Sequence, residues 1–286
     1  MIKRNIKNDF IFKKCDFKES YRYFLKDNIF LAAGPCALES EEQILKTIKF
    51  LISNNIEFIR VFPYKVRTSP YEFDGLKDEG IEIIKKIKDR YKNIRIISEI
   101  FSENQFEKLN SYVDIFQIGT RFMYHRDLLR LLGKHNKPII LKRGFSSTIY
   151  EWLLSAEFYL KENGKLIILC ERGIRTFENS VRNSFDITSI ISIREFSKIP
   201  VIIDPSHILG KRNGIEKLIL ASYYAGFNGA IIEVHPNPNK ALSDKYQQLN
   251  FNNFSNILNI LKNHKILKNN YWLYFYIYYI FLVYFY

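Results

Sequence analysis

The chain has 286 residues, of which 47% are hydrophobic, and it carries a formal net charge of +13. This length suits one large domain, because α/β barrels of about 250 residues commonly form a single domain. The lysines are scattered through the expected helices and form no cationic stripe, so nucleic-acid binding is not expected. Three cysteines are too few and too odd in number for a disulfide framework, which favours a reducing, cytoplasmic compartment.

Short apolar runs alternate with amphipathic stretches along the chain. The apolar runs predict strands at Ile29–Ala33, Phe58–Phe62, Ile94–Ile100, Asp114–Ile118, Ile139–Leu141, Leu166–Cys170, Val201–Asp204 and Ala230–Val234. The amphipathic stretches predict helices at Glu41–Ser53, Gly80–Tyr91, Glu103–Ser111, Thr148–Glu162, Asn183–Phe196 and Ile215–Ala225. Continuous hydrophobic strands joined by helices are typical of a parallel sheet covered by helices. We therefore predict a single-domain α/β fold, the (β/α)8 TIM barrel.

The two ends of the chain differ from the predicted barrel. We expect a short N-terminal extension at residues 1–28, the barrel at residues 29–265 and an aromatic hydrophobic tail at residues 266–286. The apolar run Tyr271–Tyr286 is shorter than the roughly 20 residues that a membrane-spanning helix needs. The first residues contain no apolar run of signal-peptide length. A membrane location is therefore not expected.

In a barrel of this kind, functional residues are expected at the C-terminal ends of the strands. Arginine binds phosphate and carboxylate groups through paired hydrogen bonds, and lysine acts as a point charge. Thr68 and Ser69 add hydroxyl groups beside Arg67. The pattern predicts a site for phosphorylated compounds, with some of the arginines instead paired with Glu99, Glu171 or Asp204 at the barrel mouth. The cations near strand ends are Arg60, Lys65, Arg67, Arg121, Lys142, Arg143, Arg172 and Arg175.

A second group near the strand ends could bind a metal ion. It consists of Cys36, His207, Glu233 and Asp244. A thiol, an imidazole and two carboxylates suit one divalent transition metal ion (Mn, Fe, Zn or Co) better than Mg or Ca. The residues alone leave other interpretations open, because a buried cysteine often packs as a small hydrophobe and an aspartate can cap a helix. His235 also competes with His207 as a ligand.

A series of short motifs in the chain resembles one family, the type I, β-subclass 3-deoxy-D-arabino-heptulosonate 7-phosphate (DAHP) synthases. The resemblance runs in order from about Phe30 to about Lys262. The motifs are Ala33–Ser40 (AGPCALES), Tyr64–Tyr71 (YKVRTSPY), Gln117–Arg121 (QIGTR), Leu141–Gly144 (LKRG), Ile168–Gly173 (ILCERG), Asp204–His207 (DPSH), Glu233–Pro236 (EVHP) and Leu242–Asp244 (LSD).

The resemblance implies an activity and a role for each site residue. The activity is the metal-dependent condensation of phosphoenolpyruvate with erythrose 4-phosphate, the first step of the shikimate pathway to chorismate and the aromatic amino acids. The implied metal ligands are Cys36, His207, Glu233 and Asp244, and the implied catalytic residues are Lys65, Cys36 and His207. The residues implied to bind phosphoenolpyruvate are Arg60, Lys65, Arg121, Lys142 and Arg172. Those implied to bind erythrose 4-phosphate are Arg67, Thr68, Ser69 and Asp204.

The chain departs from the family pattern at a few positions. Val66 stands where the family usually has proline, and Phe122, Tyr124 and His125 replace residues that are usually polar amides. These departures make the shape of the sugar-phosphate loop and the packing beneath the phosphoenolpyruvate site uncertain from the sequence. The family resemblance also implies a homo-oligomer, usually a tetramer. We expect no feedback inhibition by an aromatic amino acid, because the predicted ends are too short for a regulatory domain.

Two alternatives remain beside this interpretation. The sister family of 3-deoxy-D-manno-octulosonate 8-phosphate synthases uses arabinose 5-phosphate, and its loop usually reads Lys-Ala-Asn-Arg-Ser. The run Lys65–Ser69 here favours erythrose 4-phosphate instead. A second alternative is an inactive barrel that acts as the partner of a separate chorismate mutase. The presence of all four metal-ligand residues argues against it.

Overall fold

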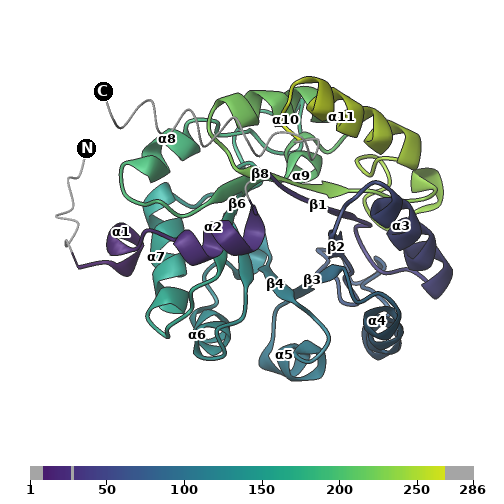
Figure 1. Ribbon diagram of the computed structural model, residues 1–286, viewed down its shortest axis with the longest axis horizontal. Helices are drawn as coiled ribbons and strands as arrows, with labels where there is room; N and C mark the ends of the chain where they lie inside the picture. Colours follow the sequence, from purple (N-terminus) through teal and green to yellow (C-terminus); the bar gives the residue numbers. More distant parts are fainter. Residues whose placement is uncertain (1–8, 27–28, 268–286) are drawn as a thin grey trace.

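Eight parallel strands form a closed barrel in the computed structural model, which describes residues 9–26 and 29–267. Each strand pairs with its neighbour in the sequence, and the first strand pairs with the last, as in Phe30 with Gly229. Helices surround the barrel (Figure 1). The predicted (β/α)8 TIM barrel is therefore confirmed. The strands are β1 (Phe30–Gly34), β2 (Phe58–Arg60), β3 (Arg95–Ile100), β4 (Ile115–Ile118), β5 (Ile139–Lys142), β6 (Ile167–Glu171), β7 (Val201–Ile203) and β8 (Gly229–Glu233).

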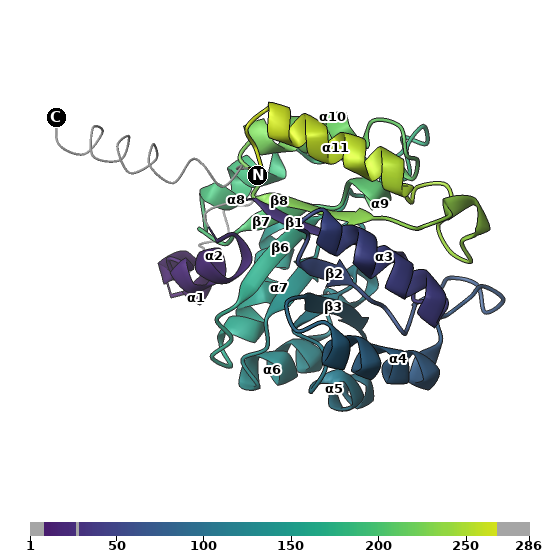
Figure 2. The same ribbon diagram turned by 45° about the vertical axis from the view of Figure 1, so that its right-hand side comes forward.

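The outer helices begin at polar caps and bury one apolar face against the sheet. Ser40 and Thr148, for example, accept hydrogen bonds from backbone N–H groups of the first turn that follows them. Figure 2 shows that α3 and α11 lie side by side, where the rings of Phe50 and Phe251 stack at 4.0 Å. The helices are α3 (Glu41–Ser53), α4 (Lys77–Arg90), α5 (Glu103–Leu109), α6 (Arg126–Lys134), α7 (Ile149–Leu160), α8 (Ser189–Arg194), α9 (Pro205–Leu209), α10 (Ile215–Tyr224) and α11 (Phe251–Asn263).

One predicted helix is wrong over its first half. The sequence pattern predicts a helix at Asn183–Phe196, whereas α8 spans only Ser189–Arg194. The backbone of Ser184 instead pairs with Ile174 in an isolated antiparallel bridge. The side-chain amide of Asn183 donates a hydrogen bond to the carbonyl oxygen of His207, 2.7 Å away. These contacts hold the residues after β6 as a loop over the end of the barrel.

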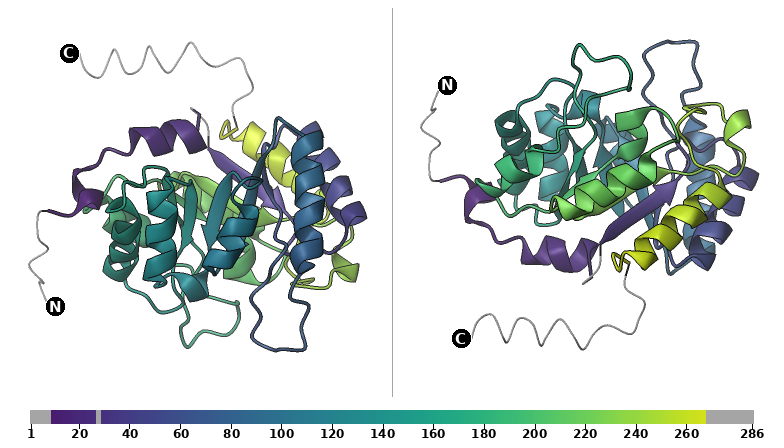
Figure 3. Two further views of the ribbon diagram at one scale, coloured as in Figure 1. Left: turned by 90° about the horizontal axis from the view of Figure 1, so that it is seen from below. Right: turned by 90° about the horizontal axis from the view of Figure 1, so that it is seen from above.

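Two N-terminal helices, α1 (Ile11–Lys14) and α2 (Lys18–Phe24), lie at the end of the barrel opposite its long loops (Figure 3). Phe24 at the end of α2 packs edge-on against Phe30, whose ring lies 4.7 Å from that of Phe58. Phe30 and Phe58 begin their strands, so Phe24 closes the N-terminal mouth of the barrel. Phe24, Phe30 and Phe58 thus belong to a buried apolar cluster at this end of the barrel.

The ends of the chain remain only partly described. Helices α1 and α2 lie within the predicted N-terminal extension, and α11 ends at Asn263 near the predicted end of the barrel. The aromatic run Tyr271–Tyr286 lies outside the described residues, so its role stays open. None of the described helices is long and apolar enough to cross a membrane.

Candidate active site at the barrel mouth

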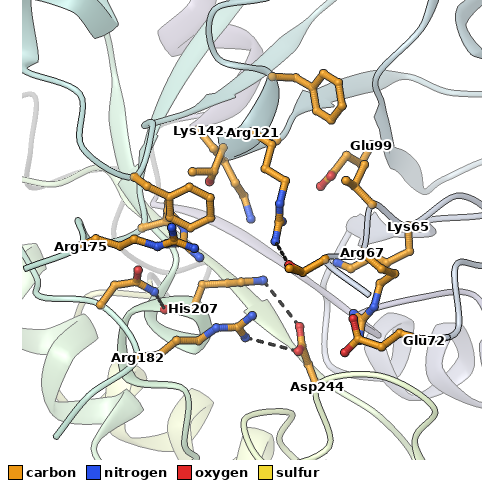
Figure 4. Close-up of a pocket in the computed structure, with 18 residues that line it drawn as sticks. Lys65, Arg67, Glu72, Glu99, Arg121, Lys142, Arg175, Arg182, His207 and Asp244 are labelled. Atoms are coloured by element: carbon orange, nitrogen blue, oxygen red, sulfur yellow. Dashed lines mark hydrogen bonds and ion pairs between the residues drawn. The ribbon is translucent and has the colours of Figure 1, made fainter. Parts of the chain in front are cut away.

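A cavity of about 260 Å³ opens at the C-terminal end of the barrel, and basic side chains dominate its wall. The side chains of Arg67, Arg121, Arg175 and Arg182 surround the same space (Figure 4). Such an excess of cations over acidic groups favours an anionic ligand with more than one charged group. The charged residues lining the cavity are Lys65, Arg67, Arg121, Lys142, Arg172, Arg175 and Arg182, with Glu72, Glu99, His207 and Asp244.

Three of the predicted arginines, Arg60, Arg67 and Arg172, have guanidinium nitrogens without a hydrogen-bond partner among the described residues. Arg172 is 3% exposed, and its Nε and Nη1 have no hydrogen-bond partner among the described residues. Burial lowers the pKa of Arg172 to about 10, although the nearby Asp204 acts in the opposite direction. Arg60 is fully buried and does not line the cavity; its Nη2 donates to Glu233 Oε1 at 3.0 Å, and its Nε and Nη1 lack partners in the described part of the chain. Buried guanidinium donors are costly to leave unpaired, so they indicate a place where a ligand supplies acceptor oxygens.

Arg143, by contrast, braces the barrel mouth. Its Nη1 donates to Glu171 Oε2 at 2.7 Å and to Asp186 Oδ2 at 2.8 Å. Its Nε and Nη2 both donate to the carbonyl oxygen of Ser147. All three side-chain nitrogens of Arg143 therefore donate hydrogen bonds within the protein, and Arg143 does not line the cavity. It connects the loops after β5 and β6 instead of facing a ligand.

The two lysines of the site lie close to acidic groups. Lys142 Nζ donates to Asp204 Oδ2 at 2.5 Å. Burial would lower the pKa of Lys65, but the acidic groups around it, Cys36 and Glu99 first among them, outweigh burial and raise that pKa. Lys65 is therefore a fixed positive charge in the wall of the cavity.

The four predicted metal ligands come together beneath this cavity. The ligand atoms of Cys36, Glu233 and Asp244 all lie within 4.8 Å of one another. His207 Nε2 lies 3.7 Å from Glu233 Oε1 and 3.8 Å from Asp244 Oδ2. A thiol, an imidazole and two carboxylates that converge in this way fit a divalent transition metal ion. His235 is not part of the group, because its Nε2 lies 3.3 Å from Glu39 and its Nδ1 accepts a hydrogen bond from the backbone of Asn237.

The electrostatics of this group also favour a bound cation. Burial would raise the pKa of Glu233, but His207 and Arg60 outweigh burial and lower it. Burial, with the charge of Glu233, raises the pKa of the Cys36 thiol. A divalent cation would stabilise the thiolate that these neighbours disfavour.

A glycine allows the cysteine to reach this group. Gly34 ends β1 with φ at +151°, and a Cβ at this position would lie 2.5 Å from the backbone oxygen of Arg60. A larger residue would therefore push β1 away from β2. The chain then continues to Cys36, whose N–H donates to Gln248 and whose Sγ lies 3.2 Å from Asp244 Oδ2.

The loop after β2 forms the outer wall of the cavity. Arg67 Nη2 donates to Glu72 Oε1 at 3.1 Å, and Thr68 Oγ1 accepts a hydrogen bond from Arg121 Nη2 at 2.8 Å. Arg67 and Thr68 line the cavity, whereas Ser69 does not. Members of both predicted anion-binding groups therefore line one cavity and contact each other through Thr68 and Arg121, whereas Arg60, Ser69 and Asp204 lie outside its lining.

Two of the departures from the family pattern, Phe122 and His125, pack in an aromatic cluster, whereas Tyr124 is exposed. The ring of Phe122 stacks on that of Phe101 at 5.3 Å and lies 6.2 Å from the ring of His125. His125 also caps α6 by accepting a hydrogen bond from Leu128 N–H. Phe122 and Val66 line the cavity, so both departures change its apolar surface.

The sequence pattern missed Arg182. Its Nη1 donates to Gln247 Oε1 at 2.7 Å and lies 3.3 Å from Asp244 Oδ1. It lies one residue before the predicted helix Asn183–Phe196 and eleven residues after the end of β6, so its position in the sequence did not suggest a place at the strand ends. Only the fold of the loop after β6 brings it to the cavity.

Comparisons with known proteins agree with this geometry. The profile of the DAHP synthetase I family matches residues 25–269. A phospho-2-dehydro-3-deoxyheptonate aldolase of Thermotoga maritima is 44% identical over 224 residues, which are 78% of this chain and 66% of that protein. The chain thus spans slightly less than two thirds of that protein's length. A 2-dehydro-3-deoxyphosphooctonate aldolase of Legionella pneumophila is 27% identical over 235 residues, 76% of this chain and 84% of that protein.

Solved structures give the same result. The crystal structure of the Thermotoga maritima DAHP synthase superposes with a TM-score of 0.80 at 41% identity, covering 85% of this chain and 72% of that one. A truncated form of 3-deoxy-D-arabino-heptulosonate 7-phosphate synthase from the same organism gives a TM-score of 0.76 at 38% identity, covering 85% of this chain and 90% of that one.

Proposed function

The chain belongs to the DAHP synthetase I family, and from this membership we propose that it is a 3-deoxy-7-phosphoheptulonate synthase. It condenses phosphoenolpyruvate with erythrose 4-phosphate and water to give the seven-carbon keto acid phosphate and inorganic phosphate. The observation that carries the proposal is the meeting of two groups in one cavity. The cationic wall suits two phosphorylated substrates, and the cluster of Cys36, His207, Glu233 and Asp244 beneath it suits a metal ion.

Phosphoenolpyruvate binds on the β4–β6 side of the cavity in this proposal. Arg121, Lys142 and Arg172 line that side, and Nε and Nη1 of Arg172 have no hydrogen-bond partner in the described ranges. Arg60, at the end of β2, and Lys65, in the loop after β2, are the other two residues proposed to bind phosphoenolpyruvate. Together they neutralise the phosphate and carboxylate groups, which would otherwise repel each other and the incoming sugar phosphate.

Erythrose 4-phosphate binds on the opposite side, against the loop after β2. Arg67 and Thr68 offer donors for its phosphate group, with Ser69 next to them in the same loop. Asp204, held by Lys142, is the proposed acceptor for the sugar hydroxyls. Substrates held in this way lie across the cavity from each other, so that their reacting carbons can meet in its centre.

Cys36, His207, Glu233 and Asp244 would hold one divalent transition metal ion, Mn, Fe, Zn or Co. When bound, this ion supplies Lewis acidity toward the aldehyde carbonyl of the sugar phosphate. His207 is oriented by Asp204, whose Oδ2 lies 2.8 Å from His207 Nδ1, which leaves Nε2 directed at the carboxylates of the group.

The reaction joins C3 of phosphoenolpyruvate to the aldehyde carbon of erythrose 4-phosphate. Water adds at C2, which becomes cationic as the bond forms, and phosphate leaves by cleavage of its C–O bond. Protonated Lys65 and the guanidinium of Arg172 place positive charge where the leaving phosphate and the aldehyde oxygen gain negative charge. Because both residues are already in place in the cavity wall, no large rearrangement is needed to stabilise that charge.

The choice of sugar phosphate is the first test of the proposal. Consumption of phosphoenolpyruvate is followed with the purified chain and Mn²⁺, once with erythrose 4-phosphate and once with arabinose 5-phosphate. We expect a clear preference for erythrose 4-phosphate. A preference for arabinose 5-phosphate would assign the chain to the sister reaction, and no consumption with either sugar would support an inactive barrel. A homo-oligomer, and a separate chorismate mutase as partner, remain predictions that a sizing measurement and a binding assay can address.

A further inference from the structure

One aromatic ring in the cavity wall lies close to three arginines. Phe145 follows β5, is half-buried and lines the cavity. The guanidinium carbon of Arg175 lies 4.1 Å from the centroid of its ring, that of Arg172 4.9 Å and that of Arg121 5.5 Å. These arginines follow two different strands, β4 and β6. The ring of Phe145 is therefore where cations from separate loops come together.

The ring stabilises these cations without occupying their hydrogen-bond donors. The face of an aromatic ring carries a negative electrostatic potential that attracts a guanidinium group. A carboxylate would attract it too, but would take up N–H groups, as Glu171 and Asp186 do with Arg143. Next to Phe145, the Nε and Nη1 of Arg172 stay without partners among the described residues. The ring offsets part of the mutual repulsion of the arginines and leaves donors for a ligand.

We propose that Phe145 is a positioning residue that holds Arg121, Arg172 and Arg175 in place for the anionic groups of phosphoenolpyruvate. The inference rests on the proposed function, which assigns Arg121 and Arg172 to that substrate, and it adds Arg175 because this residue lines the cavity beside the same ring. The backbone supports the same arrangement, because the N–H of Arg175 donates to the carbonyl oxygen of Phe145 at 2.7 Å. This backbone contact does not depend on the ring, so a side-chain substitution at Phe145 separates the effect of the ring from that of the loop.

The test compares three variants of the full chain loaded with metal. Phe145→Leu removes the ring and keeps an apolar side chain of similar size, and Phe145→Tyr keeps the ring. Phe158→Leu is the matched control, since Phe158 is also half-buried and lies 5.3 Å and 5.2 Å from the guanidinium groups of Arg126 and Arg130, away from the cavity. The measurements are kcat, the KM for phosphoenolpyruvate, and the Kd of phosphoenolpyruvate by calorimetry.

We expect Phe145→Leu to raise both the KM and the Kd for phosphoenolpyruvate by about tenfold or more, with a much smaller change in kcat. Phe145→Tyr should restore both values to within about threefold of the unmodified chain, because tyrosine retains the ring face. Phe158→Leu should leave them unchanged. An unchanged Kd in Phe145→Leu, or an equal loss in Phe145→Tyr or Phe158→Leu, would overturn the inference.

A second ligand separates this inference from the proposed function. If the unmodified chain does not bind phosphoenolpyruvate, the proposed function fails. The Kd of inorganic phosphate, measured in the same variants, then decides whether Phe145 holds an anion-binding cluster. Weaker phosphate binding in Phe145→Leu than in Phe145→Tyr supports the role of the ring, and equal binding in the two variants rejects it.

Discussion

Replacing Arg143 should strongly destabilise the fold, because it removes the partner of a buried acid. The side chains of Arg143 and Glu171 are 5% and 0% exposed. Arg143→Ala removes the contacts to Glu171, Asp186 and the carbonyl of Ser147 at once. Breaking a buried ion pair from one side costs about 3–5 kcal/mol, since the remaining charge stays buried without compensation. We expect a loss of this size in the free energy of unfolding measured by urea denaturation.

Two further variants show whether the buried charge is the cause. Lys46→Ala breaks an exposed pair with Glu42, whose side chains are 61% and 76% exposed, and should cost only about 0.5 kcal/mol or less. Adding Glu171→Gln to Arg143→Ala removes the uncompensated charge and should recover part of the loss. A loss in Arg143→Ala as small as that in Lys46→Ala, or no recovery in the double variant, would refute the reasoning.

The same cluster predicts a dependence on pH. Burial raises the pKa of Glu171, and Arg143 opposes that rise. Without Arg143 the pKa of Glu171 in the folded state should rise further above its value in the unfolded chain, about 4.3. Because a raised folded pKa favours folding at low pH, the stability deficit of Arg143→Ala should be small in acid and grow as the pH rises through the folded pKa. Urea denaturation across pH measures it, and a deficit independent of pH would contradict this account.

Three other changes have clear expected outcomes. Cys36→Ala should lower the metal content found by elemental analysis and abolish most of the activity, whereas Cys15→Ala, far from the cluster, should change neither. Phe24→Ala should lower the free energy of unfolding measured in urea by about 3–5 kcal/mol, because it leaves a cavity where the buried ring of Phe24 packs against Phe30. Thr148→Ala should cost about 1 kcal/mol in the same assay, because it removes the capping box of α7. A cost near zero for Phe24→Ala, or full metal content in Cys36→Ala, would count against the structure described above.

The strands could be predicted well because buried parallel strands are continuous apolar runs. Helix α3 was predicted with its observed bounds, since Ser40 marks its start and its apolar spacing is regular. Asn183–Thr188 was wrongly predicted as helix because its bridge and its hydrogen bond to His207 are tertiary contacts. Helix α6 was missed, because its cap is His125, a residue less typical of that position than serine or aspartate.

The site residues that lie at or just after the C-terminal end of a strand could be predicted from the sequence. Cys36, His207 and Glu233 come just after their strands or end them, and closure of the barrel brings such positions to one rim. Position after a strand could not separate Arg143 from Arg172, and only the family resemblance assigned Arg172 alone to the substrate. In the structure the loop after β6 brings Asp186 to Arg143, whereas Nε and Nη1 of Arg172 have no hydrogen-bond partner among the described residues.

The most direct test of the proposed reaction is the phosphate released per phosphoenolpyruvate consumed by the metal-loaded chain. We predict one phosphate for each phosphoenolpyruvate, with release only when erythrose 4-phosphate is present and with loss of the rate after chelation. Release that does not require the sugar phosphate, or that persists without metal, would contradict the proposed condensation.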